Sequence, residues 1–584
     1  MNSSSDRAAS PLVVLALPGL DWSRLQPPME RGELPRFTRL IEQGTWAPVA
    51  ASSGAAVSTW TTFATGVAPR IHGVLHPIER LEDTLFARAV DALSSRVPGF
   101  ATMAARAGRR VASVGWPATD GLVLADGWAI GPGADLAAGA QDDHGVLDPR
   151  TAHPAAAADA VRALRLQARD LGNAELAFFL EPLAPAQRAH VAPAFAVALA
   201  RTSTRHAWAT EALAALPADA VLLHLPLLAD VAPLLTGLGE AADAVHLRCL
   251  RFIDLVLAAY LERGEPPRVL LLSDAAFAIA AGPGVARDRM VDPLPATAVF
   301  DLMAALGALA PAGRSPPPEV EAFLDAHAPA HPTPHPPPPG PLGPADFPDD
   351  VDAHPTPDDL RRLAVAPAID WTPWREAARA IRRNTLLALA GSVAETGSAH
   401  EALAILRPLV DSAPAFLPAR ALAARLAWSL GRLDEFAALA EAGRRLHGDG
   451  VLGDTAALLG HLATRDWPAF DAQLKRAMAA DVWVINLHTV AAHACQLRGE
   501  LDEAAACLQA AVAREPRDGM AWGALGDAWG RLGRHAEATS AHGRAVSLQP
   551  GLRAPLMKLS EAQGRAGDRD ASMRTLLRAG RARA

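Results

Sequence analysis

Three histidines and three cysteines are the first residues whose side chains could bind a metal ion. His327, His331 and His335 follow one another at intervals of four residues, which would place their imidazole rings on one face of a helix. The prolines among them forbid such a helix, because proline lacks an N–H and fixes φ. No zinc-binding spacing and no disulfide framework links the cysteines, which are Cys249, Cys495 and Cys507. We therefore expect no metal site in either set, and a reducing, cytoplasmic compartment.

These histidines belong to a proline-rich segment that separates two kinds of sequence. It holds 15 prolines between Pro316 and Pro357, and is expected to be an extended linker. A chain of 584 residues is also too long for a single core, so two or three domains are expected. The expected order is a disordered N-terminus over 1–10, an α/β domain over 11–314, the linker over 315–360, a lead-in helix over 361–382 and repeats over 383–584.

The repeats are visible as glycines on a 34-residue frame. The frame carries Gly397, Gly431, Gly499, Gly533 and Gly567, with Arg465 in the remaining slot. Six units begin near residues 383, 417, 451, 485, 519 and 553. This period is typical of stacked helix–turn–helix units, in which the glycine forms the turn because a positive φ costs it little.

The units resemble tetratricopeptide repeats, most clearly where Trp522, Leu525, Gly526, Trp529 and Ala538 keep one register. The resemblance implies an all-α solenoid that binds a protein or peptide partner along a groove lined by the first helix of each unit. The groove residues that it implies are Arg425, Trp428, Asn486, Thr489, His493, Gln496, Asp527 and Arg531. The alternative is that Trp428 and Thr489 are packing residues.

The N-terminal part alternates short apolar runs with helical stretches. The expected strands are Leu12–Leu17, Val111–Val114, Ala220–Leu225 and Val269–Leu272. Their uninterrupted apolar character is typical of a parallel sheet buried on both faces. Amphipathic stretches such as 34–43 and 241–262 are the expected helices, which predicts a layered α/β domain.

Five short sequence motifs in this part resemble motifs of one family, and they follow one another along the chain in the same order as in that family. They are Val14–Trp22, Trp60–Gly66, Gly115–Thr119, Val269–Asp274 and Gly282–Val285. They resemble the alkaline phosphatase superfamily, in its type I phosphodiesterase/nucleotide pyrophosphatase branch. The resemblance implies two metal ions, usually zinc, held by six Asp or His ligands, and a Ser or Thr nucleophile that the metals activate.

The positions that the family uses for chemistry are filled differently here. The nucleophile position is occupied by Ala56, which has no hydroxyl. Four positions for metal ligands are occupied by residues that cannot bind a metal ion: Pro18, Leu227, Val231 and Ala275. The last expected His has no candidate in 277–288, so Asp274 is the sole ligand-type residue kept. We therefore expect a degenerate domain with no catalytic residues and no cofactor, in which Asp274 caps a strand end. The chain is then a pseudoenzyme that serves as an interaction scaffold.

Two alternatives remain at this stage. An active metal-dependent phosphodiesterase or phosphatase would need two zinc ions in a shifted site, with the repeats recruiting substrate. Such a site could be built from Ser58, Asp21, Asp274, His224 and Asp230, with Ser52, Ser53 and Thr59 near the nucleophile slot. Otherwise Ser58 and Thr59 cap the following helix. A transferase on the same fold would need the same metals and nucleophile.

Charge and hydropathy exclude further classes. The net charge of −8 argues against a dedicated nucleic-acid binder. No run reaches the roughly 18 apolar residues of a membrane span, and the short apolar stretch Pro11–Leu20 is interpreted as a buried strand and not as a secretory signal. The abundance of Ala, Pro and Arg indicates a GC-rich bacterial genome.

Overall fold

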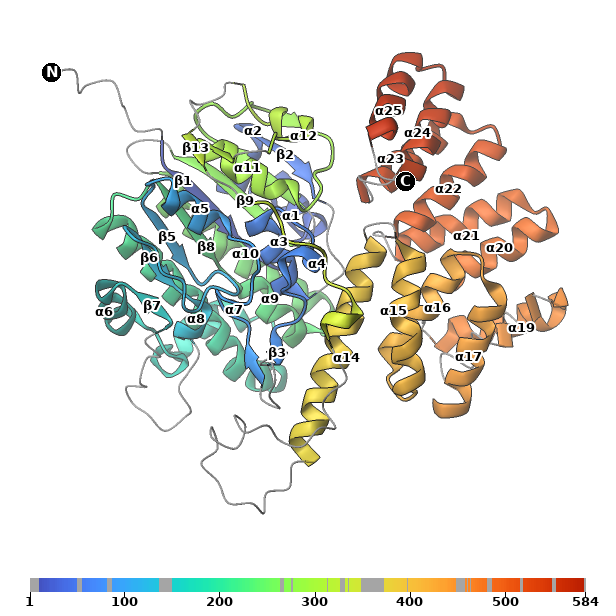
Figure 1. Ribbon diagram of the computed structural model, residues 1–584, viewed down its shortest axis with the longest axis horizontal. Helices are drawn as coiled ribbons and strands as arrows, with labels where there is room; N and C mark the ends of the chain where they lie inside the picture. Colours follow the sequence, from blue (N-terminus) through green and yellow to red (C-terminus); the bar gives the residue numbers. More distant parts are fainter. Residues whose placement is uncertain are drawn as a thin grey trace. The chain divides into compact units, whose positions relative to one another are not determined.

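The computed structural model divides into two units, which are described separately (Figure 1). The first runs to Pro341, apart from Ile78–Arg80 and 87–88, which group with the second unit. The structure describes residues 10–49, 55–80, 87–135, 150–262, 267–274, 277–311, 314–325, 331–333, 336–347, 372–395, 398–447, 457–458, 461–462, 464–480, 486–514, 518–548 and 553–581.

The first unit is built around a nine-stranded sheet of order β11-β2-β10-β9-β1-β8-β5-β6-β7. Strands β9, β1, β8, β5 and β6 are parallel, whereas β10 pairs antiparallel with both β9 and β2, and β7 antiparallel with β6. The four predicted strands are confirmed as β1 (Leu12–Ala16), β5 (Val111–Val114), β8 (Ala220–His224) and β9 (Arg268–Ser273). The others are β2 (Gly44–Pro48), β6 (Trp128–Ile130), β7 (Ala152–His153), β10 (Phe277–Ala281) and β11 (Arg289–Met290).

Helices cover both faces of this sheet, which is why its central strands are mostly apolar. Side chains alternate between the faces, so Val13 and Leu15 of β1 join one core while Val14 joins the other. The first core is covered by α1 (Trp22–Glu30), α2 (Pro35–Glu42), α6 (Ala155–Leu164), α7 (Asn173–Leu180), α8 (Pro185–Ala215), α9 (Leu227–Val231) and α10 (Gly239–Leu261). The second is covered by α3 (Ala56–Thr65), α5 (Phe100–Arg106) and α11 (Ala298–Leu306). Shorter elements are α4 (Pro69–His72), η1 (Pro132–Asp135), η2 (Ala168–Asp170) and η3 (Ala232–Leu235).

Part of the expected linker is folded onto the first unit. Strand β12 (Leu309–Pro311) pairs in parallel with β13 (His331–Thr333), and α12 (Pro318–Glu321) lies between them in sequence. Val320 and Phe323 are fully buried in the second core. The expectation of an extended linker from residue 315 is therefore wrong for this segment. Proline is tolerated in the first turn of a helix, and the two apolar side chains anchor the segment. A 3₁₀ turn, η4 (Pro344–Asp346), follows, and 348–371 lie outside the described residues.

The second unit consists mainly of helices in antiparallel pairs, coloured yellow to red in Figure 1. They are α14 (Thr372–Glu395), α15 (Ala399–Ser412), α16 (Leu417–Ser429), α17 (Leu433–His447), α19 (Trp467–Ala480), α20 (Leu487–Arg498), α21 (Leu501–Arg514), α22 (Gly519–Arg531), α23 (His535–Leu548), α24 (Arg553–Arg565) and α25 (Arg569–Arg581). The short strands β3 (Ile78–Arg80) and β4 (Ala87–Ala89) pair beside α14. The described part of the expected lead-in helix, 372–382, and the first helix of the first repeat are one helix, α14. Among the described residues no helix is long and apolar enough to cross a membrane.

The predicted repeat register is confirmed by the turns between paired helices. Gly431, Gly499, Gly533 and Gly567 all have positive φ, as the glycine frame requires. Arg465, which occupies the slot without a glycine, also has a positive φ, of 55°. The frame therefore continues through the third unit although its turn residue is an arginine.

This turn allows a direct test of the register. Because an L-residue with a side chain is strained at positive φ, Arg465→Gly should raise the free energy of unfolding by about 1 kcal/mol. As a control, Arg425→Gly in the middle of α16 should lower it by about 1 kcal/mol, since glycine is a poor helix former. Urea unfolding monitored by circular dichroism measures both. Destabilisation by Arg465→Gly would contradict the proposed turn.

Candidate functional site

The positions that the family uses for chemistry lie at the carboxyl ends of the central strands. Strand β1 is paired in parallel with both β8 and β9, so the three strands end at the same edge of the sheet. Pro18 follows β1, Asp274 follows β9, and Leu227 and Val231 begin and end the short helix α9 after β8. The tertiary structure therefore brings the predicted slots together, and none of the three aliphatic or imino side chains offers a metal ligand.

Asp274 is committed to the backbone at this edge. Its Oδ1 accepts a hydrogen bond of 2.8 Å from the N–H of Gly19, which joins the ends of β9 and β1. Gly19 has a φ of +77°, and a Cβ there would lie 2.8 Å from the backbone nitrogen of Ala229 in α9. Helix α9 is thus packed directly onto the end of β1. The carboxylate serves as the strand-end cap that was expected from the sequence.

The position that corresponds to the nucleophile, Ala56, lies at the start of helix α3. Ala56 is the first residue of α3 and is exposed, with Ala55 as the N-cap. Ser58 and Thr59 lie within the first turns of the helix and are buried, and among the described residues no side chain caps its N-terminus. The alternative in which Ser58 and Thr59 cap the helix is therefore wrong, because the helix begins two residues earlier. Ser52 and Ser53 lie outside the described residues.

A buried arginine from α8 occupies the region beside β8. Arg205 is 4% exposed and forms an ion pair with Asp135 of η1. Its guanidinium also donates hydrogen bonds of 3.0 Å to the carbonyl oxygens of Gly115 and His224. Arg201, one helical turn earlier, is 3.5 Å from Asp135 and 2.8 Å from Asp230. Two arginines and two aspartates thus balance one another at the ends of β5 and β8.

His224 is held as a neutral imidazole within this network. Burial, followed by the charges of Arg205 and Arg201, lowers the pKa of His224 well below its ordinary value. Its Nδ1 lies 2.9 Å from the Arg205 guanidinium, which can only donate, so Nδ1 accepts and the ring proton resides on Nε2. Burial raises the pKa of Asp230, although Arg201 opposes this.

Tryptophans fill the space beyond His224. The indole ring of Trp60 packs edge-on against two other rings. The distance between ring centroids is 5.2 Å to the imidazole of His224 and 5.6 Å to the indole of Trp116. The indole nitrogens of Trp60 and Trp116, and Nε2 of His224, are buried and have no hydrogen-bond partner in the part of the chain that the structure describes. An indole N–H is a donor only and cannot ligate a metal ion.

The residues present at this edge do not fit two zinc ions. Arg205 and Arg201 place positive charge beside the histidine that a divalent cation would need. No group of three His, Cys, Asp or Glu side chains in the described part of the chain could hold a metal. Ala275 lies outside that part.

The shifted site considered from the sequence is not assembled either. Asp21 caps α1 by accepting the N–H of Ser23 at 2.7 Å, and is directed to that helix. Asp230 is paired with Arg201, and His224 with Arg205. Each candidate ligand is thus bound to a different neighbour, and Ser58 is buried within α3.

Comparison with known proteins supports the N-terminal resemblance. Three of the five motifs fall within a segment that matches a family model by sequence. Residues 12–152 match the type I phosphodiesterase/nucleotide pyrophosphatase family. We call the first unit the phosphodiesterase-like domain from here on. No curated protein matches the chain significantly.

Among solved structures, the chain is similar to tetratricopeptide-repeat and other helical-repeat proteins. A crystal structure of MamA is 14% identical, with 33% of this chain and 92% of that chain covered and a TM-score of 0.17. YrrB, titled a TPR protein with an unusual peptide-binding site, is 16% identical, with 30% and 90% covered and a TM-score of 0.21. Human IFIT1 with PPP-AAAA is 16% identical, with 34% and 49% covered and a TM-score of 0.28.

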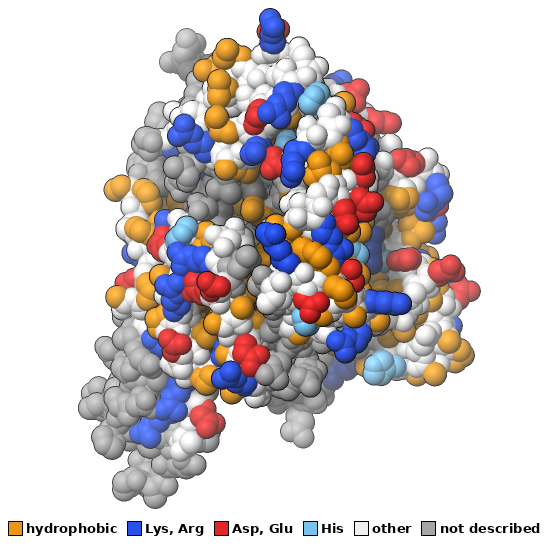
Figure 2. All heavy atoms as spheres, turned by 90° about the vertical axis from the view of Figure 1, so that its right-hand side faces the viewer, with side chains coloured by type: hydrophobic (Ala, Val, Ile, Leu, Met, Phe, Trp, Pro, Cys, Tyr) orange, Lys and Arg blue, Asp and Glu red, His pale blue; other side chains and the backbone are white. Residues whose placement is uncertain are grey.

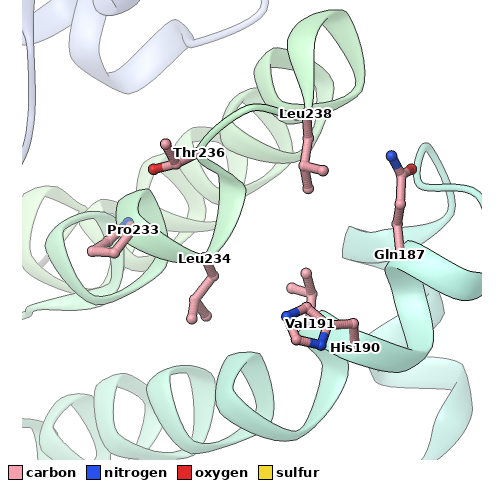
Figure 3. Close-up of a pocket in the computed structure, with 7 residues that line it drawn as sticks. All are labelled: Gln187, His190, Val191, Pro233, Leu234, Thr236 and Leu238. Atoms are coloured by element: carbon pink, nitrogen blue, oxygen red, sulfur yellow. The ribbon is translucent and has the colours of Figure 1, made fainter. Parts of the chain in front are cut away.

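A pocket of about 300 Å³ lies elsewhere in the phosphodiesterase-like domain (Figure 3). Its walls come from α8, which contributes His190 and Val191, and from the segment Pro233–Leu238 after α9. The side chains that line it are mainly apolar, and none of them corresponds to a family position for chemistry. The pocket and the strand ends are therefore different places in the domain.

In the repeats, the structure brings together some of the predicted groove residues. Trp428 of α16 meets His493 of α20 edge-on at 5.8 Å, across two repeats. Asp527 of α22 lies 3.1 Å from Lys558 of α24, so the first helices of neighbouring repeats do contact one another through these faces. Arg425 and Arg531 are exposed.

The prediction that Asn486 lines the groove is wrong, because its side chain is buried. Asn486 is 5% exposed, caps α20, and donates from Nδ2 to the carbonyl of Ala511 at 2.9 Å. Thr489 donates to the Asn486 carbonyl at 2.6 Å. The loop before α20 thus uses Asn486 to hold the helix pair, which leaves it unavailable to a partner. Gln496 is half-buried, and no contact decides its role.

Sequence reasoning missed Arg205, which dominates the strand-end region. The available signal was weak: Arg201 and Arg205 are spaced by four within a long, otherwise mostly apolar helix, so both lie on one buried side. Nothing local indicated that their partners would be Asp135 and His224.

Proposed function

We propose that this protein is an interaction scaffold whose phosphodiesterase-like domain has lost catalysis. The observation that carries the proposal is the Arg205 network at the strand ends. A guanidinium bound to Asp135 and His224 supplies positive charge where the family relies on metal ions. A hydroxyl nucleophile is activated by a metal ion or a general base. The imidazole beside Ser58 is that of His72, which is hydrogen-bonded to the Ser58 carbonyl and lies 3.0 Å from the hydroxyl of Thr62, so it is engaged by groups other than the Ser58 hydroxyl.

The repeats supply the proposed interaction. Stacked helical repeats present extended surfaces on which peptides bind. The aromatic pair of Trp428 and His493 provides an anchor of the type that peptide-binding surfaces use, and the exposed Arg425 and Arg531 provide charge. A protein or peptide partner is favoured over nucleic acid by the net charge of −8. Three free cysteines agree with a reducing, cytoplasmic compartment.

Elemental mass spectrometry after gel filtration in zinc-, manganese- and iron-supplemented buffer tests the loss of catalysis. We expect less than about a tenth of an equivalent of metal per chain, because the strand ends offer no complete ligand set. Asp274→Ala should leave this value unchanged.

Hydrolysis of bis(p-nitrophenyl) phosphate in the same buffers provides the second readout. The wild type and Asp274→Ala should both match the rate of buffer alone. About two equivalents of metal, lost together with hydrolysis in Asp274→Ala, would instead establish the active phosphodiesterase.

A further inference from the structure

Helix α25 exposes a stripe of large apolar side chains. Met573, Leu576 and Leu577 are 58%, 42% and 61% exposed. Their spacing of three and four residues places them on one side of the helix, and we call these three residues the end stripe. Thr575 and Ala579 on another side of α25 are buried, so the helix is packed on its repeat while the end stripe is left uncovered.

Earlier repeats bury the positions that correspond to Met573 and Leu576, whereas the position of Leu577 corresponds to the exposed Gln509 of α21. Subtracting two periods from Met573 and Leu576 leads to Ala505 and Leu508 of α21, which are 3% and 2% exposed. These two residues belong to one apolar cluster with Ala521 and Leu525 of the following helix, α22. In the fourth repeat, therefore, the first helix of the next repeat contributes to covering this side of the second helix.

The next repeat shows the same arrangement. Val546 of α23 is buried in a cluster with Leu556 and Leu559 of α24. The equivalent position in α25 is Gly580, beside the exposed Leu576 and Leu577. Met573 and Leu576 of the end stripe therefore correspond to positions of α21 that lie in one apolar cluster with the following helix, and Leu577 extends the stripe beside them. Isolated exposed apolar residues need no explanation, but a continuous stripe at a helix-packing position does.

The positive charge of α25 indicates which kind of helix could bind to the end stripe. Helix α25 carries four arginines and a single acidic residue, Asp570: the arginines are Arg569, Arg574, Arg578 and Arg581. Arg569 precedes Met573 by one turn, and Arg574 lies beside Leu577, and both are exposed. Figure 2 shows hydrophobic side chains beside both basic and acidic ones on the face that it draws. Two copies of α25 would place like charges against each other, which disfavours self-association.

We propose that the end stripe binds an amphipathic helix of a partner protein, with acidic residues beside its apolar side. The apolar side of that helix would cover Met573, Leu576 and Leu577, as α22 helps to cover Leu508. Its carboxylates would face Arg569 and Arg574. This inference rests on the interaction half of the proposed function and is independent of the metal measurement, so that either can fail alone.

Two synthetic peptides spanning 518–531, the sequence of α22 with its cap, serve as probes. Both are stapled on the exposed side to fix the helix. The acidic peptide carries M520E and R531E, and the basic peptide carries M520K and D527K. Fluorescence anisotropy with the full-length protein should show that the acidic peptide binds at least about tenfold more tightly than the basic one. Doubling the ionic strength should weaken this preference.

Substitutions in the protein locate the binding surface. Leu577→Glu should weaken binding of the acidic peptide at least about tenfold, because it places a carboxylate within the apolar contact. Met520→Glu is the matched control, since Met520 is 57% exposed on another repeat, and it should leave binding unchanged. Both side chains are exposed, so both variants should keep the wild-type circular dichroism spectrum.

Three results would overturn the proposal. They are the absence of binding by the acidic peptide, equal binding of both peptides, and equal effects of the two protein substitutions. Sedimentation equilibrium provides a further test of the occupant. Dimerisation abolished by Leu577→Glu would identify a second copy of the chain as the molecule that covers the end stripe.

Discussion

Replacing Arg205 with methionine should lower the free energy of unfolding of the phosphodiesterase-like domain by about 3–5 kcal/mol. Methionine keeps much of the side-chain volume but removes the cation from Asp135, which is 4% exposed on its side chain. Arg201 remains 3.5 Å from that carboxylate, which places the expected loss near the lower end of the range. The carbonyl oxygens of Gly115 and His224 would also lose their donor.

Urea unfolding followed by tryptophan fluorescence measures this loss, since Trp60 and Trp116 are buried close to the network. Arg201→Met is the matched control in the same helix. Its side chain is 26% exposed, so we expect a smaller loss of about 1 kcal/mol. A loss below about 1 kcal/mol for Arg205→Met would show that the buried ion pair contributes little.

A double-mutant cycle with Asp135→Asn separates the ion pair from packing. Removing both charges avoids leaving either of them buried alone, so the double variant should be more stable than the sum of the single losses predicts. We expect a coupling energy between Arg205 and Asp135 of at least about 1.5 kcal/mol. Additive single effects would assign the stabilisation to the contacts of Arg205 with Gly115 and His224 instead.

The phosphodiesterase-like domain should also lose stability in mild acid because of His72. This histidine is fully buried, its Nε2 lies 3.0 Å from the hydroxyl of Thr62, and its Nδ1 accepts the N–H of Val74 at 3.1 Å. Protonation of Nδ1 would break the second hydrogen bond. Burial lowers the pKa of His72 from 6.5 to about 3, opposed by a hydrogen bond to the Ser58 carbonyl.

The sign follows from proton binding. Below pH 6.5 the unfolded chain protonates this histidine while the folded chain does not, so stability falls as the pH decreases toward about 3. At pH 5 the loss from His72 alone is about 2 kcal/mol. Burial lowers the pKa values of His224 and His246 as well, and these histidines act in the same direction.

Comparing variants isolates the His72 contribution from that of the other titrating groups. His72→Gln should be less stable than the wild type at pH 7.5, and the difference should shrink by about 2 kcal/mol at pH 5. His190→Gln changes an exposed histidine and should follow the wild-type profile. A constant difference between His72→Gln and the wild type across this range would contradict a neutral, buried His72.

Local patterns predicted those parts of the fold that local physics determines. The strands β1, β5, β8 and β9 are short apolar runs, and both faces of the sheet bury them. The edge strands β7 and β11 have only two residues each, too few for any periodicity to be read. The repeat register was predictable through Arg465, because helices of similar length repeat the same turn.

The prediction of an extended linker, which was based on composition, is wrong for the first part of that segment. A high proline content predicted an extended segment from residue 315, yet Val320 and Phe323 anchor its beginning in the second core. Whether such a segment folds depends on an apolar surface outside the segment, here the second core with α11. Composition averages over these few anchoring residues and hides them.

At the candidate site, the missing side chains can be read from the sequence. Pro18, Ala56, Leu227 and Val231 carry no ligand or nucleophile wherever they lie. The group that stands in that region, Arg205 held by Asp135, His224 and Gly115, becomes visible only in the folded domain. Arg205 lies 90 residues from Gly115, and such a pairing depends on how α8 crosses the ends of β5 and β8, which no local periodicity encodes.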